Sequence, residues 1–121
     1  MGEDPRHQFG AGAEERAAAF LEQKGLKILE RNVVLKVGEI DLVAKDGDTL
    51  VFVEVRARTH PDQVHPAATV TPAKQRRVVR CAMAYCQRHQ VRDTMIRFDV
   101  VAVLGPRGGI EHYPNAFEAG R

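Results

Sequence analysis

The sequence predicts an α/β fold, built as a mixed β-sheet of about five strands flanked by helices. Two amphipathic helical segments alternate with runs of β-branched and aliphatic residues, in the order helix, strand, hairpin, helix, strand, strand. The length of 121 residues is enough for one domain with a single core. Hydrophobic residues make up 44% of the chain and charged residues 28%, as in globular proteins. We therefore expect one domain over residues 1–121, with flexible ends at 1–9 and 118–121.

The first helix is expected over residues 11–24, and Gly25 stands where a glycine commonly ends a helix. Apolar side chains at helical spacing form its inner stripe: Ala13, Ala17, Phe20 and Leu21. Glu14 lies nearly in line with Leu21, because seven residues make almost two turns. A carboxylate on the buried side of a helix needs a partner. Glu14 therefore either edges the core beside a base or belongs to a site.

Residues 26–36 are predicted to form the first strand, interrupted near Arg31-Asn32, and residues 38–58 a β-hairpin. The turn decides how the acids of the hairpin meet. A two-residue loop Gly47-Asp48 (type II′) places Asp41 directly opposite Glu54, whereas a loop Asp46-Gly47 (type I′) places the two on a diagonal. Either loop keeps both carboxylates on one face, because side chains alternate along a strand.

Two carboxylates side by side repel, and the pKa of each rises unless a cation sits between them. A hard divalent cation, Mg²⁺ or Mn²⁺, suits such a pair, since it takes one or two carboxylates together with waters and phosphate oxygens. Arg56 and Arg58 follow Glu54 on the same face of the strand. An Asp followed by Glu-x-basic therefore suggests metal-assisted hydrolysis of a phosphodiester.

The second helix is predicted from Thr71-Pro72, a strong N-cap and N1 pair, to about residue 89. Its buried face is expected to be formed by Val78, Cys81, Ala82 and Tyr85. It carries five bases and no acid: Lys74, Arg76, Arg77, Arg80 and Arg88. Such a helix either exposes a solvated face or contacts phosphates. The net charge of +2 is too small to argue nucleic-acid binding by itself.

The remaining strands are expected at residues 94–104, whose near-continuous apolar character indicates a central position, and at 110–113. Asp99 is expected to form a structural salt bridge with Arg97 on the same face, and Phe117 to cap the core.

The loop at residues 59–70 contains His60 and His65, which either touch DNA or a metal or are simply solvated. Cys81 and Cys86 match neither a local disulfide nor a CxxC metal pair, which favours reduced, partly buried thiols. No apolar run approaches the roughly 20 residues of a membrane helix, and no signal peptide is evident. A cytoplasmic location is expected.

The hairpin resembles a known signature. Residues 38–44 (GEIDLVA) followed by 51–58 (VFVEVRAR) resemble the PD-(D/E)xK nuclease motif and, more narrowly, the small bacterial YraN-like family, similar in fold to archaeal Holliday-junction resolvases. The resemblance covers nearly the whole chain. It also includes residues 10–21, Thr71 with Lys74, residues 97–101 and residues 115–117. It implies a restriction-endonuclease-like or resolvase-like fold.

The resemblance also implies residue roles and partners. Asp41 and Glu54 would hold Mg²⁺ or Mn²⁺, and Glu14, which matches the glutamate of the family's first helix, would complete the metal site directly or through water. Arg56 stands where the signature usually has lysine; it could stabilise the phosphate or orient water, but it cannot serve as a general base. The residues expected to grip the DNA backbone are Arg58, Lys74, Arg76, Arg77 and Arg80. A homodimer is expected if the substrate is a four-way junction, which has two scissile strands.

Two other interpretations stay open. Arg56 favours a catalytically degenerate nucleic-acid-binding module, in which binding survives the loss of Asp41. Alternatively, the charges are structural, with Asp41 paired to Arg56 and Glu39 paired to Arg58 across the hairpin.

Overall fold

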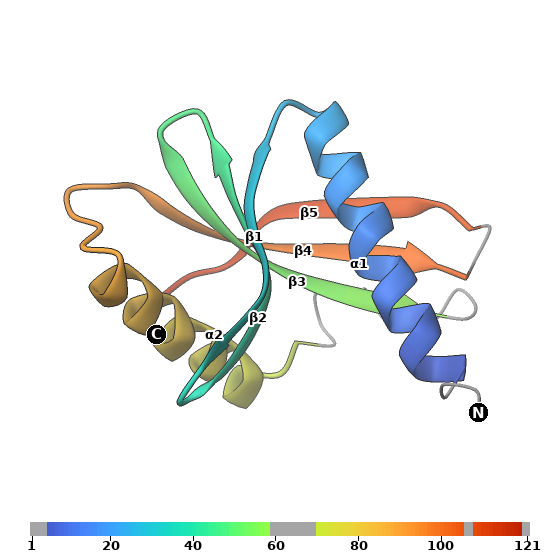
Figure 1. The fold of residues 1–121 in the computed structure, drawn as a ribbon, viewed down its shortest axis with the longest axis horizontal. Helices are drawn as coiled ribbons and strands as arrows, with labels where there is room; N and C mark the ends of the chain where they lie inside the picture. Colours follow the sequence, from blue (N-terminus) through green and yellow to red (C-terminus); the bar gives the residue numbers. More distant parts are fainter. Residues whose placement is uncertain (1–4, 59–69, 106–107, 120–121) are drawn as a thin grey trace.

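The computed structural model describes residues 5–58, 70–105 and 108–119, so His60 and His65 lie outside the described residues. Helices and strands follow one another in the predicted order (Figure 1). The elements are α1 (Pro5–Gln23), β1 (Lys27–Leu35), β2 (Gly38–Asp46), β3 (Thr49–Arg58), α2 (Pro72–Arg88), β4 (Ile96–Leu104) and β5 (Ile110–Phe117). No helix among the described residues is long and apolar enough to cross a membrane.

The five strands form one mixed sheet in the order β1-β2-β3-β4-β5, which confirms the predicted fold class. Only β3 and β4 pair in parallel, and α2 is the crossover that parallel neighbours require. Two boundaries differ from the sequence prediction by more than two residues. α1 begins at Pro5, in keeping with the preference of proline for the first helical turn. β5 continues to Phe117 because it is an edge strand, where Pro114 is tolerated.

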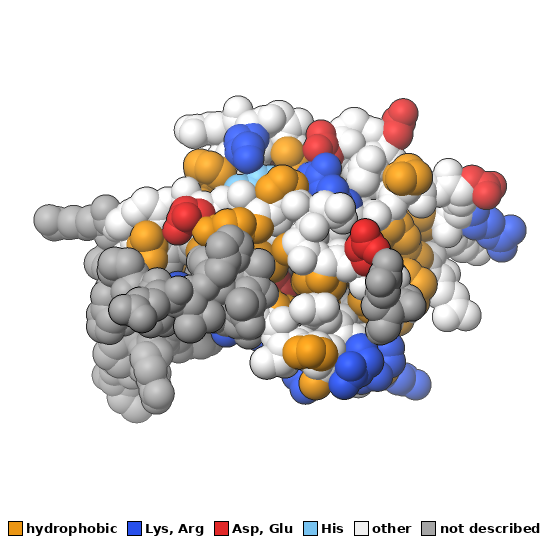
Figure 2. All heavy atoms as spheres, turned by 180° about the vertical axis from the view of Figure 1, so that it is seen from behind, with side chains coloured by type: hydrophobic (Ala, Val, Ile, Leu, Met, Phe, Trp, Pro, Cys, Tyr) orange, Lys and Arg blue, Asp and Glu red, His pale blue; other side chains and the backbone are white. Residues whose placement is uncertain are grey.

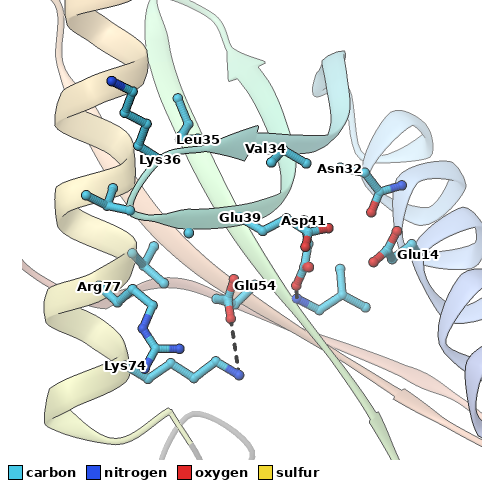
Figure 3. A pocket seen from close by; sticks show the side chains of 14 residues that line it. Glu14, Asn32, Val34, Leu35, Lys36, Glu39, Asp41, Glu54, Lys74 and Arg77 are labelled. Atoms are coloured by element: carbon cyan, nitrogen blue, oxygen red, sulfur yellow. Dashed lines mark hydrogen bonds and ion pairs between the residues drawn. The ribbon is translucent and has the colours of Figure 1, made fainter.

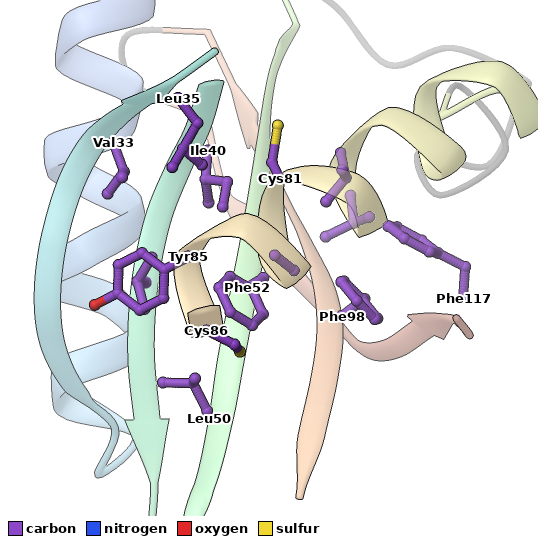
Figure 4. Close-up of a cluster of buried hydrophobic side chains, with 14 of the residues drawn as sticks. Val33, Leu35, Ile40, Leu50, Phe52, Cys81, Tyr85, Cys86, Phe98 and Phe117 are labelled. Atoms are coloured by element: carbon purple, nitrogen blue, oxygen red, sulfur yellow. The ribbon is translucent and has the colours of Figure 1, made fainter. Parts of the chain in front are cut away.

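The helices cover opposite faces of the sheet, which divides the expected single core into two clusters, and Figure 4 shows the cluster that packs against α2. Four buried residues of α1 pack over one face: Ala13, Ala17, Ala18 and Leu21. On the other face α2 buries Val78, Cys81, Ala82, Tyr85 and Cys86. Phe98 stacks between Phe52 and Phe117 in this second cluster, so Phe117 does cap the core. Both cysteines are free and buried, as predicted.

The β2–β3 hairpin has the two-residue loop Gly47-Asp48, because Asp46 pairs with Thr49. Gly47 has a φ of 60°, whereas Asp48 is not among the residues with positive φ, which identifies the type II′ turn. The same register pairs Leu42 with Val53. Continued by one residue, it places Glu54, not Arg56, opposite Asp41.

The β1–β2 hairpin twists about midway along its length, and beyond this point it separates from β3. Ile40 packs in the α2-side cluster, yet Leu42, two residues on, packs in the α1-side cluster. On the neighbouring strand Asn32 has a φ of 51°, although pairing continues on both sides of it. The interruption expected near Asn32 is therefore a change of side-chain phase. Pairing between β2 and β3 ends at Leu42 and Val53, where the strands part.

Candidate active site

A cavity of about 1100 Å³ opens where β2 parts from β3, between the two helices (Figure 3). Its walls come from α1, the β1–β2 hairpin, β3 and α2. The charged side chains that line it are Glu14, Lys36, Glu39, Asp41, Glu54, Lys74 and Arg77. The charged residues that line the cavity belong to neither of the two apolar clusters.

Asp41 sits in the fork between the strands. Its Oδ2 accepts a hydrogen bond of 2.8 Å from the Val55 N–H. Val55 lies two residues after Val53, the last residue of β3 that pairs with β2. The pKa of Asp41 is nonetheless raised, chiefly because the carboxyl is desolvated by burial. The Val55 hydrogen bond and the charges of Lys74 and Arg56 oppose that shift without cancelling it. The backbone thus fixes the orientation of a carboxylate whose charge is only partly stabilised.

Glu54 is almost completely buried, with 4% of its surface exposed. Desolvation and the neighbouring charge of Asp41 raise its pKa to about 7, against the opposing charges of Lys74 and Arg56. Lys74 Nζ lies 3.6 Å from Glu54 Oε1 and reaches it from the first turn of α2 (Figure 3). A buried carboxyl whose pKa is shifted to near neutral is a candidate functional group.

Glu14 approaches the same cavity from α1, so its carboxylate faces the site as the helical phase predicted (Figure 3). Burial and the charge of Asp41 raise its pKa, and the charge of Glu39 adds to this. A hydrogen bond with the Asn32 side chain acts in the opposite direction. Asn32 therefore has two roles: its left-handed backbone turns the strand, and its side chain holds Glu14.

Gly38 allows the tip of the β1–β2 hairpin to pack closely against α2. Its φ of 153° is one that other residues rarely adopt, and a Cβ there would lie 3.1 Å from Cys81 Sγ and 3.3 Å from Arg77 Cδ. This close approach brings the strand that carries Asp41 beside the helix that carries Lys74. The glycine thus positions the two walls of the cavity.

The family model described as "Uncharacterised protein family UPF0102" matches residues 13–103. The chain belongs to this family. It is 43% identical over 117 residues to a UPF0102 protein of Myxococcus xanthus, covering 95% of this chain and 93% of that protein. A UPF0102 protein of Anaeromyxobacter dehalogenans is 47% identical over 117 residues, covering 95% and 87% of the two chains. One from Pelotomaculum thermopropionicum is 45% identical over 118 residues, covering 94% and 98%.

UPF0102 is the YraN family and belongs to the restriction-endonuclease-like superfamily, so the resemblance seen in the sequence is confirmed. The matched span, residues 13–103, includes every charged residue that lines the cavity.

The structure brings together most, but not all, of the residues singled out in the sequence. Glu14, Asp41, Glu54, Lys74 and Arg77 line one cavity. Four others are not among its lining residues in the described part of this UPF0102 chain: Arg56, Arg58, Arg76 and Arg80. Arg56 is half-buried beside the site, and its charge lowers the pKa of both Asp41 and Glu54.

Sequence reasoning missed part of the cavity wall. Asn32 was noticed only as a strand interruption, although an asparagine within a strand is a signal for positive φ. Residues 34–37 at the hairpin tip also line the cavity, and Val34 is 69% exposed there. Val37, which is 46% exposed beside Lys36 in the two-residue turn, was the available sign of this exposed wall.

The donor set suits a hard divalent ion held by few protein ligands. Within the described residues no group of three or more His, Cys, Asp and Glu side chains is arranged to hold a metal ion. Asp41 and Glu54 therefore fit an ion that takes two carboxylates and completes its shell with waters and phosphate oxygens, as Mg²⁺ commonly does. Glu14 fits a supporting role through water.

Proposed function

We propose that this UPF0102 protein is a divalent-metal-dependent endonuclease that hydrolyses phosphodiester bonds in DNA, with branched or otherwise structured DNA as its substrate. The observation that carries the proposal is the pair Asp41 and Glu54, two carboxyls of raised pKa that face one open cavity beside Lys74. Such a pair favours the binding of a cation, and an open cavity leaves room for a phosphate beside it.

Asp41 and Glu54 would hold Mg²⁺ or Mn²⁺, with Glu14 joining directly or through water. When bound, the ion lowers the pKa of coordinated water and neutralises charge on the phosphate. The Val55 N–H keeps Asp41 oriented, and Asn32 keeps Glu14 oriented. Arg56 supports the charged form of both carboxyls and, as a guanidinium, is not a general base.

The proposed reaction is a hydrolysis of the phosphodiester. A water oxygen forms a bond to phosphorus while one bridging P–O bond breaks. The attacking water loses a proton to solvent, and the departing oxygen gains one from solvent. No oxidant, reductant or second substrate is needed.

Basic side chains lie where DNA would enter. Lys74 and Arg77 line the cavity, and Arg76 and Arg80 are exposed on the same helix. Figure 1 places the tip of the β1–β2 hairpin and the start of α2 at the lower edge of the molecule, and Figure 2 shows Lys and Arg side chains gathered at that edge from behind. Contacts with phosphates supply affinity without sequence information. Two-fold dimerisation is the arrangement that would present two such sites to a junction.

The test combines Mn²⁺ calorimetry with cleavage of a labelled four-way junction and of a matched linear duplex. Asp41→Asn and Glu54→Gln remove ligand charge with little change of shape. Glu14→Gln is compared with Glu15→Gln, which alters the neighbouring but exposed carboxylate on the same helix. Junction-preferring cleavage that requires Mn²⁺ and falls by at least about 100-fold in Asp41→Asn and Glu54→Gln, with Glu15→Gln unchanged, is the expected result.

Cleavage that persists in both ligand variants would contradict the proposal, as would folded wild-type protein without a Mn²⁺ site that depends on Asp41. Equal cleavage of junction and duplex would contradict the preference for branched DNA and leave the chemistry intact.

A second function is favoured by one observation, the arginine at the usual lysine position. A UPF0102 chain that binds branched DNA with equal affinity in wild type and in Asp41→Asn, without metal-dependent cleavage, would be a nucleic-acid-binding module of the same fold. The same set of variants decides between the two.

A further inference from the structure

We propose that Lys74, rather than Arg56, supplies the cation that contacts the reacting phosphate or its attacking water. The inference rests on the nuclease proposed above and assigns a residue within that site. It accounts for the arginine in the hairpin: the cationic position of the signature is filled from a different element of the fold.

Lys74 occupies the required place. It lines the cavity together with Asp41 and Glu54, and its Nζ lies 3.6 Å from Glu54 Oε1. About a third of its side chain, 34%, stays exposed, and the side chain lines the cavity while its ammonium contacts the carboxylate. Figure 3 shows the side chain extending from α2 toward Glu54, with Asp41 beyond it. Arg56 is not among the residues that line the cavity in the described chain.

The position of Lys74 is built into the start of α2. Thr71 is the N-cap, and its side chain accepts a 3.2 Å hydrogen bond from the Lys74 N–H. Pro72 occupies the first helical turn, where its fixed φ favours the helix. Lys74 is therefore held at the positive end of the helix dipole, where backbone N–H groups and a cationic side chain together favour an anion.

The chemistry of the two cations matches this division. An ammonium is a compact charge with three donors, so Lys74 can keep its contact with Glu54 and still donate to a phosphate oxygen or to water. Arg56 lies two residues after Glu54 on β3 and acts on both carboxyls through its charge. In this arrangement Arg56 balances the carboxylate pair, and Lys74 faces the substrate.

The test compares Lys74→Met with Arg76→Met. Each variant removes one positive charge from the first two turns of α2, but Arg76 is exposed and does not line the cavity among the described residues. Three quantities are measured: single-turnover cleavage at saturating DNA with Mn²⁺, DNA affinity without divalent metal over a range of salt, and Mn²⁺ affinity without DNA. Lys74→Arg and Arg56→Met complete the set, and circular dichroism checks that each variant is folded.

Lys74→Met is expected to lose about 100-fold or more in single-turnover rate, the size of effect seen when one preorganised donor is removed from a transition state. Arg76→Met should lose at least about 10-fold less of that rate than Lys74→Met, while both variants weaken DNA binding alike and reduce the salt slope by about 1. Mn²⁺ affinity should rise a few-fold in Lys74→Met but not in Arg76→Met, because a cation beside the metal-holding Glu54 is gone. Lys74→Arg should recover part of the lost rate.

Cleavage by Lys74→Met that matches Arg76→Met would overturn the assignment of Lys74 and leave the nuclease proposal standing. A loss of single-turnover rate in Arg56→Met alone would also overturn the assignment of Lys74. Arg56 in the hairpin would then be the residue that supplies the cation. Wild-type protein that cleaves none of the DNA substrates would overturn the nuclease proposal and this one with it.

Discussion

Glu54 and Asp99 are the two charged residues that are almost completely buried among those described, and they sit in opposite electrostatic environments. Both stand on central, largely apolar strands that pair directly with each other. Burial by itself raises the pKa of Asp99, yet hydrogen bonds from His112, Arg97 and the Asn115 N–H lower it overall. The pKa of Glu54 is raised to about 7. Similar burial therefore has opposite consequences.

The partners explain the difference. Arg97 donates from Nε and Nη2 to the two oxygens of Asp99, at 2.9 and 3.0 Å, and from Nη1 to Asp46 at 2.9 Å. His112 Nε2 lies 2.7 Å from Asp99 Oδ2, and the Asn115 N–H donates to Oδ1 at 2.9 Å. Among the described residues, Glu54 pairs with Lys74 at 3.6 Å and has the Asp41 carboxyl beside it. The groups around Asp99 outweigh its desolvation and lower its pKa, whereas those around Glu54 do not.

Asp99 is a structural acid, whereas Glu54 is the acid for which we propose a function. A buried carboxylate that stabilises the fold gathers donors until its charge is fully compensated. A carboxylate kept for binding retains an uncompensated charge, and the fold is less stable for it. The expectation that Asp99 forms a structural salt bridge with Arg97 is confirmed, with His112 and Asn115 as partners that the sequence did not indicate.

The largest effect is expected from Asp99→Asn. Asn keeps one acceptor oxygen but loses the charge, so the part-buried Arg97 and His112 face an amide in place of a carboxylate, and such a loss costs about 3 kcal/mol or more of unfolding free energy. Urea unfolding at pH 7 measures it. Because the pKa of Asp99 is lowered, its contribution is present above the unfolded value of about 3.8 and lost as the pH falls through the lower folded value.

Asp46→Asn is the matched control, since Asp46 contacts the same guanidinium but its side chain is 45% exposed. Its cost should stay below about 1 kcal/mol, as for exposed ion pairs. Equal losses of unfolding free energy in Asp99→Asn and Asp46→Asn would contradict the distinction between a hydrogen-bonded buried acid and a surface acid.

Glu54→Gln should have the opposite sign. The folded pKa of Glu54 lies above the unfolded value of 4.5, so its carboxylate lowers stability progressively as the pH rises from about 4.5 to 7. Gln removes that penalty, and the variant should be more stable than wild type at pH 8 by about 1–3 kcal/mol and nearly equal to it at pH 4.5. Urea unfolding at both pH values, without divalent metal, measures the difference.

The groups that face Glu54 set this balance: Asp41 from β2, Arg56 from its own strand and Lys74 from α2. A Glu54→Gln variant that is less stable than wild type at pH 8 would show that the pair with Lys74 outweighs desolvation. Glu54 would then be a structural acid like Asp99.

Much of the fold was predictable from local patterns. Hydrophobic periodicity placed both helices, and Thr71-Pro72 marked the start of α2 correctly. The Gly47-Asp48 alternative for the hairpin loop was also correct, because turn chemistry is local. The end of β5 was missed because Pro114 is a strand breaker everywhere except at an edge, and whether a strand is an edge depends on the whole sheet.

The candidate site was predictable only where residues share an element or a signature. Asp41 and Glu54 follow from the hairpin, and helical phase turns Glu14 inward. The sequence could not show that Lys74 reaches Glu54, since the contact joins elements separated by a crossover. Nor could it show that the strands part at Asp41, which depends on the rotation centred on Asn32.

The smallest of these effects tests how the functional acids are held in place. Gly38→Ala places a methyl group 3.1 Å from Cys81 Sγ at a φ of 153°, which should cost about 1–2 kcal/mol of unfolding free energy. Gly12→Ala is the control of opposite sign, because Gly12 lies within α1 with nothing within 4 Å of the added Cβ, and it should stabilise by about 0.5–1 kcal/mol. Thermal and urea unfolding compare the two.

The same Gly38→Ala variant should also weaken Mn²⁺ binding several-fold, because the hairpin tip shifts away from α2 and carries Asp41 with it, while the Asp99 cluster on β4 and β5 is untouched. A loss of unfolding free energy with unchanged Mn²⁺ affinity would show that the packing of the hairpin tip against α2 does not affect the carboxylate pair Asp41 and Glu54. In that case the position of Asp41 is fixed by its hydrogen bond to Val55 alone, and the functional acid would be held by the sheet itself, as Asp99 is.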